Sequence, residues 1–246
     1  MKKNNIYIFI GSILIVLLYS CTKYTPLNTT TTTNTTTASD TAPVIKFYDV
    51  MDFGSMDVNL NSKKVSSVAK YYASSYITAK EGTNAVSLNF PNKSSVLNAS
   101  LDLVRNTKYS CFFYMVGNEW KYNLVKDDLS VAPSTNYSAI RVLDFRTEAY
   151  YNYINVRVAS PGGDLIDQKN RNFLDHVTYS GYSNFKTITS GTYSIKMYND
   201  TLTTSQRLGV NFDSKGIYSI ILTTPGNITP YSNAIFYIYP DVAKHN

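Results

Sequence analysis

Tyr76-Ile-Thr-Ala-Lys-Glu-Gly-Thr-Asn-Ala-Val-Ser-Leu88 returns in altered form as Phe185-Lys-Thr-Ile-Thr-Ser-Gly-Thr-Tyr-Ser-Ile-Lys-Met197. The two segments lie 109 residues apart, and the same spacing relates Tyr109-Ser-Cys-Phe-Phe113 to Tyr218-Ser-Ile-Ile-Leu222. Both matches fit without a gap. The chain beyond Pro43 is therefore predicted to contain two copies of one unit.

Two shorter matches lie nearer the start of each copy. Val44-Ile-Lys-Phe47 matches Ala139-Ile-Arg-Val142, and Met56-Asp-Val-Asn-Leu60 matches Ile154-Asn-Val-Arg-Val158, at spacings of 95 and 98 residues. The five-residue segments alternate apolar and polar side chains, which predicts strands with one face on a core and the other in water. Because the spacing grows along the chain, the second copy is predicted to carry an insertion, at Ser160-Pro-Gly-Gly-Asp164 and the polar residues after it.

The composition of the 246 residues is typical of a β-protein. Only 16% of them are charged and only three are Glu, whereas 22 are Tyr; an average globular chain has about 25% charged residues. Each copy offers six or seven short strands in roughly 90 to 110 residues, the size of an immunoglobulin-like sandwich. We therefore predict an all-β fold of two tandem immunoglobulin-like antiparallel β-sandwich domains, at residues 43–131 and 132–246, with at most a short helical turn.

The start of the chain is predicted to be a lipoprotein signal peptide. Lys2 and Lys3 precede the uncharged, mostly apolar run 6–18, whose length suits a secretory signal better than a spanning helix. Leu18-Tyr-Ser-Cys21 resembles the bacterial lipobox, although Tyr19 departs from the small or β-branched residue usual there. The resemblance implies that residues 1–20 are removed and that Cys21 carries lipid, which tethers the protein without spanning the membrane. An ordinary signal peptide or an uncleaved anchor is the alternative.

Residues 21–42 are predicted to form a disordered tether after the lipid. They are rich in Thr, with scarcely an apolar side chain, so they cannot bury enough surface to offset chain entropy. Asp40-Thr41-Ala42 and Asp200-Thr201-Leu202 resemble the short O-glycosylation acceptor motif of Bacteroidetes. Thr41 and Thr201 are therefore O-glycosylation candidates, and an unmodified spacer is the alternative.

The join between the two copies resembles a known family. The residues that carry the resemblance are Tyr109 to Val125, then Asp127-Asp-Leu-Ser-Val-Ala-Pro133, then Ala139-Ile-Arg-Val142. They are similar to the domain of unknown function 4397 of bacterial exported lipoproteins, and the similarity covers about residues 43 to 225. This chain departs from that family at residues 144–148, where a Ser-Pro-Asp-like turn is usual. The resemblance implies a tandem β-sandwich lipoprotein without established activity, and it supplies no catalytic residues.

Few nucleophiles or bases stand out. Two Cys and two His do not suit a disulfide framework or a His/Cys zinc cluster. Ser67-Val-Ala-Lys70 and Ser183-Asn-Phe-Lys186 match Ser-x-x-Lys, but the partner motifs of the penicillin-recognising enzymes are missing, so both are interpreted as chance. Cys111 is predicted to be a small buried hydrophobe, and His176 a loop or strand residue.

The paired carboxylates are weak candidates for a metal site. Asp127-Asp128 and Asp164 with Asp167 are close enough in sequence to hold a cation, but calcium needs 6 to 8 oxygen ligands and no Asp-x-Asp-x-Asp-Gly ladder occurs. All four are interpreted as solvated turn residues. No metal, no cofactor and no enzymatic activity are expected.

Tyrosine is the residue type most enriched for a binding role, because its ring and hydroxyl can contact sugars or another protein. The alternative is that Tyr serves only as a strand-forming, half-buried aromatic residue. The candidate glycan- or partner-binding residues, which cluster in loop-like parts of the two copies, are Tyr71, Tyr72, Tyr150, Tyr151, Tyr153 and Tyr182.

The leading hypothesis is a non-enzymatic, lipid-anchored envelope protein with a structural or protein-interaction role. The alternatives are a glycan-binding surface lipoprotein and a fimbrial subunit whose strand 235–239 is donated to a neighbour rather than completing its own sandwich. Removal of Lys2 and Lys3 lowers the formal charge from +6 to +4, and without a basic run nucleic acid is not an expected partner. An outer-membrane location facing the periplasm is slightly favoured over the cell surface, since residues 22–26 lack an acidic pair.

Overall fold

The computed structural model describes residues 42–51, 54–69, 72–91, 95–131, 133–146, 153–198, 203–223 and 235–240. Within Thr37–Asn246 the chain forms one compact unit. The described residues up to Val131 are called the first half below, and those from Pro133 the second half. The predicted signal peptide, Cys21 and the tether lie outside the described residues.

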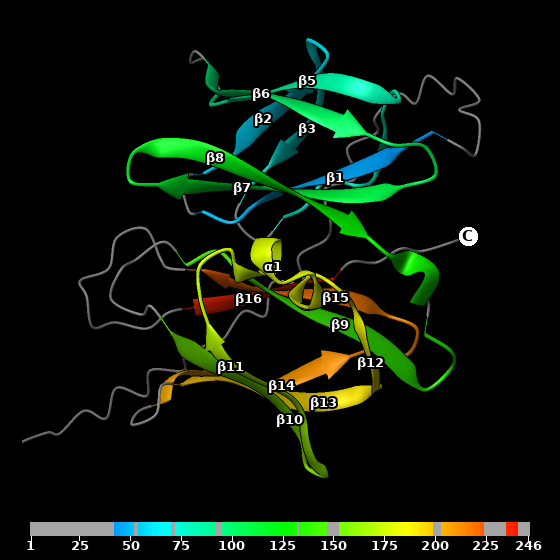
Figure 1. Ribbon diagram of the computed structural model, residues 1–246, viewed down its shortest axis with the longest axis vertical. Helices are drawn as coiled ribbons and strands as arrows, with labels where there is room; N and C mark the ends of the chain where they lie inside the picture. Colours follow the sequence, from blue (N-terminus) through cyan, green and yellow to red (C-terminus); the bar gives the residue numbers. More distant parts are fainter. Residues whose placement is uncertain are drawn as a thin grey trace, which may run out of the picture. The chain divides into compact units, whose positions relative to one another are not determined.

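The first half is built from two four-stranded sheets (Figure 1). One has the strand order β4-β1-β7-β8 and the other the order β3-β2-β5-β6. The strands are β1 (Val44–Asp49), β2 (Met56–Leu60), β3 (Lys63–Val68), β4 (Ile77–Thr78), β5 (Gly82–Asn89), β6 (Ser95–Leu103), β7 (Lys108–Val116) and β8 (Glu119–Asp127).

The second half repeats this order strand for strand, as β12-β9-β15-β16 and β11-β10-β13-β14. Strands β5 and β13 start at Gly82 and Gly191, the spacing predicted from the sequence, and both glycines have positive φ. The strands are β9 (Tyr137–Asp144), β10 (Ile154–Ser160), β11 (Gly163–Arg171), β12 (Lys186–Thr189), β13 (Gly191–Tyr198), β14 (Thr203–Phe212), β15 (Ile217–Thr223) and β16 (Ile235–Pro240).

The predicted all-β sandwich architecture is confirmed, but two of the four sheets are mixed rather than purely antiparallel. β1 runs parallel to β7, and β9 runs parallel to β15. Residues 50–107 and 145–216 connect the partners, and such a long connection lets two strands run in the same direction. The parallel pair and the four-plus-four order distinguish each half from the seven-stranded, wholly antiparallel immunoglobulin sandwich.

The insertion in the second half lies mostly later than predicted. The turns β2–β3 and β10–β11 both have two residues, Asn61-Ser62 and Pro161-Gly162. The extra residues lengthen β11 and fill segment 172–185, which holds α1 (Asp175–Thr178) and the 3₁₀ turn η3 (Ser180–Tyr182). These elements and the 3₁₀ turn η1 (Leu129–Val131) are short, and no helix in the described ranges has the length and apolar character to cross a membrane.

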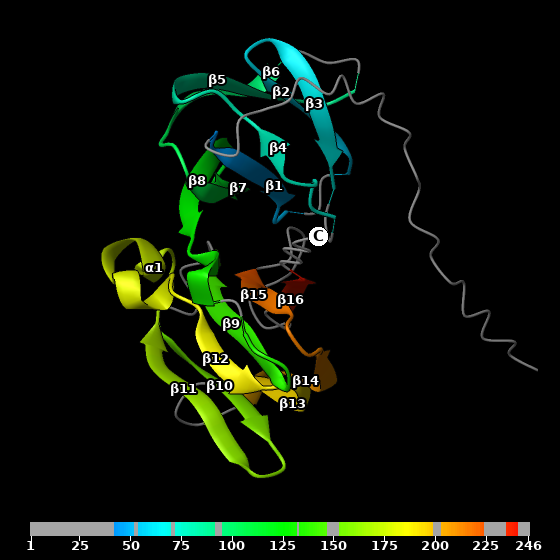
Figure 2. The same cartoon turned by 90° about the vertical axis from the view of Figure 1, so that its right-hand side faces the viewer.

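Each half has a core between its two sheets (Figure 2). In β2 and β10 every second side chain points into that core, as Met56, Val58 and Leu60 do in the first half and Ile154, Val156 and Val158 in the second. The side chains between them face outward, so the sheets β3-β2-β5-β6 and β11-β10-β13-β14 each present a polar face to solvent.

A third buried cluster contains residues of both halves. It uses the second faces of β1, β7, β9 and β15, which explains why these strands are buried on both sides. The Phe112 and Phe145 rings lie 5.0 Å apart between centroids in this cluster. Its buried members are Tyr48, Val50, Met51, Phe112, Tyr114, Val125, Leu143, Phe145 and Ile221.

In both halves a hydrogen bond from the backbone to a tyrosine hydroxyl fixes the corner where the chain turns into β7 or β15. The backbone N–H of Val104 donates to the Tyr109 hydroxyl at 3.1 Å, and that of Asp213 donates to the Tyr218 hydroxyl at 2.9 Å. Both tyrosines are nearly buried. A side chain at Gly216 would collide with the Tyr218 ring, so glycine leaves the space that this arrangement needs.

Replacing either corner tyrosine, in Tyr109→Phe or Tyr218→Phe, is expected to lower the free energy of unfolding by about 1 to 2 kcal/mol, because a backbone donor loses its partner. Urea unfolding measures the change. The exposed Tyr72→Phe is the matched control, with an expected change within about 0.5 kcal/mol. Equal stability of all three variants would show that the corner hydrogen bonds contribute nothing.

Candidate functional site

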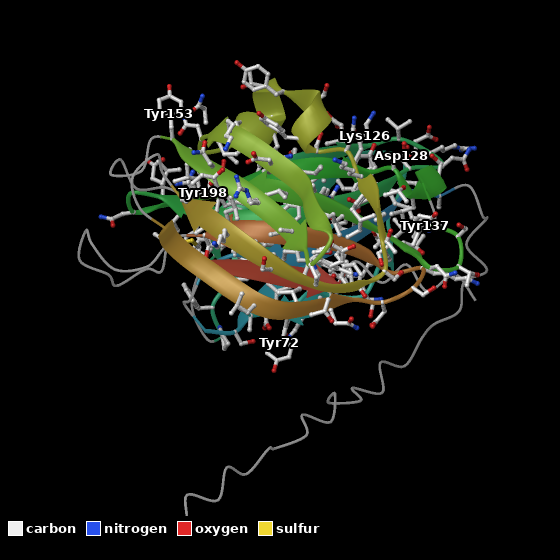
Figure 3. The ribbon with its side chains drawn as sticks, turned by 90° about the horizontal axis from the view of Figure 1, so that it is seen from below. Tyr72, Lys126, Asp128, Tyr137, Tyr153 and Tyr198 are labelled. Atoms are coloured by element: carbon white, nitrogen blue, oxygen red, sulfur yellow. The ribbon has the colours of Figure 1, made fainter. Side chains whose placement is uncertain are left out.

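The predicted binding tyrosines that can be placed do not form one group. Tyr72 is 58% exposed next to a short bridge to Ala69, and Tyr153 is 62% exposed just before β10. Figure 3 shows both side chains pointing outward from the ribbon. Tyr71, Tyr150 and Tyr151 lie outside the described residues, as do the O-glycosylation candidates Thr41 and Thr201.

Tyr182 is a packing residue more than a free ring. The guanidinium carbon of Arg171 lies 4.1 Å from its ring centroid, and Arg171 is bound on its other side by Asp175 at 2.6 Å. Tyr179 lies edge-on at 6.0 Å from Tyr182 and is 65% exposed. The contact between Tyr182 and Arg171 thus packs the inserted segment 172–185 against the buried Arg171–Asp175 ion pair.

A group of interacting polar side chains lies on the outer face of β10, β11 and β13. Tyr198, at the end of β13, is flanked by Arg157 of β10 and Lys169 of β11, whose charged centres lie 5.3 and 4.8 Å from the ring centroid. The Tyr198 hydroxyl donates to Asp167 Oδ1 at 3.0 Å. Lys196 is the direct strand partner of Arg157 and therefore shares its face.

These five residues, Arg157, Asp167, Lys169, Lys196 and Tyr198, are called the cationic face below. Lys169 Nζ lies 3.1 Å from Asp167 Oδ1, and Arg157 Nη2 lies 3.7 Å from Oδ2. Burial opposes ionisation of Asp167, but hydrogen bonds from Lys169 and Tyr198 and the charges of Lys169 and Arg157 outweigh it, so the pKa of Asp167 is lowered. Hydrogen bonds to Tyr198 and Asp167 raise the pKa of Lys169, which keeps its ammonium charged at neutral pH.

Figure 3 shows Tyr153 and Tyr198 on the same side of the second half. Tyr153 stands two residues before Asn155, the strand partner of Tyr198. Of the tyrosines chosen from sequence, Tyr153 is thus the one that adjoins the cationic face. The other members were missed because each was judged alone; a comparison of the two copies position by position would have singled out Arg157, Lys196 and Tyr198.

No protein-family model matches the chain, and no curated protein matches it. The function must therefore be inferred from the arrangement of its own side chains.

Asp127 contradicts its interpretation as a solvated turn residue. It is buried at the end of β8, where its carboxylate accepts from Arg141 Nη2 at 2.7 Å, from Ser110 Oγ at 2.7 Å and from the Tyr76 hydroxyl at 2.9 Å. Hydrogen bonds and an ion pair replace the lost hydration of its charge. Asp128 is exposed and binds Ser130, as a turn residue does. Asp167 is a surface residue of the cationic face, and the Asp164 side chain is outside the described set.

Arg141, the partner of Asp127, belongs to β9 of the second half. Its Nε donates to Ser219 Oγ at 2.8 Å, and its guanidinium carbon lies 4.4 Å from the ring centroid of Phe185. A second buried pair, Arg146 with Asp144 at 2.6 Å, lies on the same strand and its flank. The interactions of Arg141 hold β8, β9 and β15 together. Arg146 Nη2 also donates to the Arg171 carbonyl at 3.2 Å, so the second pair links the end of β9 to β11.

The cysteine and the histidine in the described part of the chain are both buried. Cys111 is fully buried in the first core, and burial raises the pKa of its thiol well above the ordinary value. His176 was predicted in a loop or strand but lies in α1, because the insertion forms a helical turn there. Its Nε2 is 3.0 Å from Asn123 Oδ1, and burial lowers its pKa to about 4.

The remaining sequence candidates have structural partners. The Ser67 hydroxyl donates to Asp57 at 2.7 Å and the Ser183 hydroxyl to the Ser180 carbonyl at 2.8 Å, so both Ser-x-x-Lys serines serve their own turns or strands. Trp120 packs edge-on against Phe90 at 6.2 Å. Among the residues that the structure describes, no group of three or more His, Cys, Asp or Glu side chains is placed to hold a metal ion.

Proposed function

We propose that this chain is a lipid-anchored protein of the bacterial cell envelope that makes non-covalent contacts with another envelope component and catalyses no reaction. The proposal rests on which side chains are buried and which are exposed. Cys111, His176 and Asp127 are buried in packed or ion-paired sites. Cations and tyrosine rings face the solvent instead, which suits contact better than bond-breaking chemistry.

The lipid anchor is the part of this proposal that the first 21 residues support. The Leu-Tyr-Ser-Cys21 sequence after an apolar run would place diacylglycerol on the thiol and hold the protein at the outer membrane, on the periplasmic side. Membership of the domain of unknown function 4397 family is proposed on the same terms, from the residues around the join of the two copies.

The variant Cys21→Ala is expected to move the protein from the membrane fraction to the soluble fraction and to remove the acyl mass from the intact protein. The matched control is Cys111→Ala, which replaces the other cysteine of the chain and should leave both readouts unchanged. A Cys21→Ala protein that stays in the membrane pellet with an unchanged mass would refute the anchor. Protease treatment of intact cells then reports which side of the membrane the protein faces.

Glycan binding through exposed tyrosines is the second candidate, and the exposure of Tyr72 and Tyr153 favours it. A glycan array compared between the native chain and the Tyr72→Ala and Tyr153→Ala variants separates it from a purely structural role, since unaffected signals would exclude these rings. The fimbrial alternative is less well supported, because β16 pairs along its length with β15 of the same chain.

A further inference from the structure

The two halves provide an internal comparison of what the scaffold needs. In the first half Asn59 pairs with Ser87, and in the second half Arg157 pairs with Lys196 at the corresponding place on the same two strands. Likewise, Asp57 pairs with Asn89 in the first half, and Asn155 pairs with Tyr198 at the corresponding place in the second half. The register therefore shows which side chains of the two outer sheets are equivalent.

At three equivalent positions the second half carries a larger or charged side chain: Arg157 for Asn59, Lys196 for Ser87 and Tyr198 for Asn89. The first half folds its sheet with the short uncharged residues, in which Asn59 donates to Ser87 at 3.2 Å. Folding of the sheet thus does not require cations at these positions. Their presence in the second half needs another explanation.

The described charged side chains of the two outer faces also differ. On the cationic face three cations accompany a single carboxylate, Asp167. On the first half's outer face Asp57 neutralises Lys64 at 2.7 Å, and the Asp102 carboxylate accepts from Thr83. An anionic partner would therefore be attracted to the second half and not to the first.

The geometry suits an extended chain rather than a small ion. Lys169, Arg157 and Lys196 lie on three successive strands, β11, β10 and β13, and neighbouring strands lie about 4.8 Å apart. Arg157 lies directly opposite Lys196 on one side and Asp167 on the other, and Lys169 stands two residues after Asp167 on β11. The three cations thus spread over about 10 Å of an outward-facing sheet, and the Tyr198 ring lies beside Arg157 and Lys169. Tyrosine can pack on a sugar ring while its cationic neighbours bind acidic groups.

We infer that the cationic face binds an acidic polysaccharide, with Arg157, Lys169 and Lys196 pairing its carboxylate or sulfate groups and Tyr198 packing on a sugar ring. This inference rests on the proposed contact function and names the chemical class of the partner. None of the five residues of the cationic face has an aliphatic side chain that could insert into lipid, so a soluble polymer fits it better than an anionic membrane surface.

The test uses the full chain purified in an uncharged detergent and titrated with polygalacturonate, with neutral dextran and phosphatidylglycerol vesicles in parallel. Saturable binding of polygalacturonate that weakens as salt rises is expected, with no binding of dextran. The triple variant Arg157→Asn, Lys196→Ser, Tyr198→Asn installs the residues of the first half and is expected to weaken binding at least tenfold. The single variant Lys196→Ser should weaken it severalfold.

Lys64→Ser is the matched control, since it removes one cation from the equivalent face of the first half and should leave binding unchanged. A thermal unfolding curve like that of the native chain shows that the triple variant is folded. Unchanged polygalacturonate binding in the folded variants, stronger binding of vesicles than of polygalacturonate, or no binding at all would overturn the inference. If the protein fails to bind polygalacturonate but still carries lipid at Cys21 and stays in the membrane, the inference is wrong and the proposed function still stands.

Discussion

Asp127→Asn is expected to lower the free energy of unfolding by about 3 to 5 kcal/mol, because it leaves the buried Arg141 guanidinium without its counter-charge. The two groups meet at 2.7 Å and both side chains are fully buried. Arg141 is held in place by Ser219 and Phe185, so it cannot turn toward water to recover its hydration. Urea unfolding monitored by tyrosine and tryptophan fluorescence measures the loss.

The control for this prediction is an ion pair at the surface. Lys64→Gln breaks the exposed pair with Asp57, also 2.7 Å long, and is expected to cost less than about 1 kcal/mol. A double variant, Asp127→Leu with Arg141→Met, removes both buried charges and should be much more stable than Asp127→Asn alone. Equal, small losses at the buried and exposed pairs would contradict the importance given to the buried one.

Protein stability is expected to fall by about 3 kcal/mol between pH 6.5 and pH 4 through His176 alone. Burial lowers the pKa of this histidine from 6.5 to about 4 in the folded protein, so the unfolded chain binds a proton first as the pH falls. The full free energy of unfolding associated with neutral His176 is thus present above pH 6.5, and it is lost as the pH falls toward 4. Each pKa unit corresponds to about 1.4 kcal/mol.

His176→Gln removes this titration while keeping an amide that can bond to Asn123. Its urea midpoint should change little between pH 6.5 and pH 4.5, whereas that of the native protein falls. His245→Gln, the other histidine of the chain, is the control and should behave like the native protein. A native protein with a flat stability profile over this range would refute the burial assigned to His176.

The repeat spacing predicted the strands well. Gly82 and Gly191 begin β5 and β13, and the match of Tyr109 with Tyr218 recurs as the same hydrogen bond in both halves. Such agreement follows because the spacing compares two copies of one fold, so each confirms the boundaries of the other. The strand at 235–240 pairs as expected with β15.

Other features could not be obtained from periodicity. The match of Val44–Phe47 with Ala139–Val142 indicates a repeated element but not the direction of its strand, so the parallel pairing with β7 was missed. Asp127 next to Asp128 resembles a turn, and only the fold brings Arg141 close enough to neutralise it. The insertion was predicted at Ser160-Pro-Gly-Gly-Asp164 and the polar residues after it, but most of the extra residues lengthen β11 and the connection that follows it.

The candidate site, like the fold, could be predicted from the sequence only in part. Exposure of Tyr153 was anticipated from its position in a tyrosine-rich, loop-like stretch. Tyr198, in contrast, lies in a strand beside residues that are 41 and 29 positions away, Arg157 and Lys169. Their proximity depends on the order β11-β10-β13, which a single sequence pattern does not specify.

Hydrogen–deuterium exchange with and without polygalacturonate tests the contact role of the second half most directly, because it locates the bound polymer. Slower amide exchange is predicted in peptides of β10, β11 and β13, with unchanged exchange in β2 and β5, their equivalents in the first half. Slower exchange in the first half's outer sheet instead, or no change in either sheet at saturating polymer, would contradict the account.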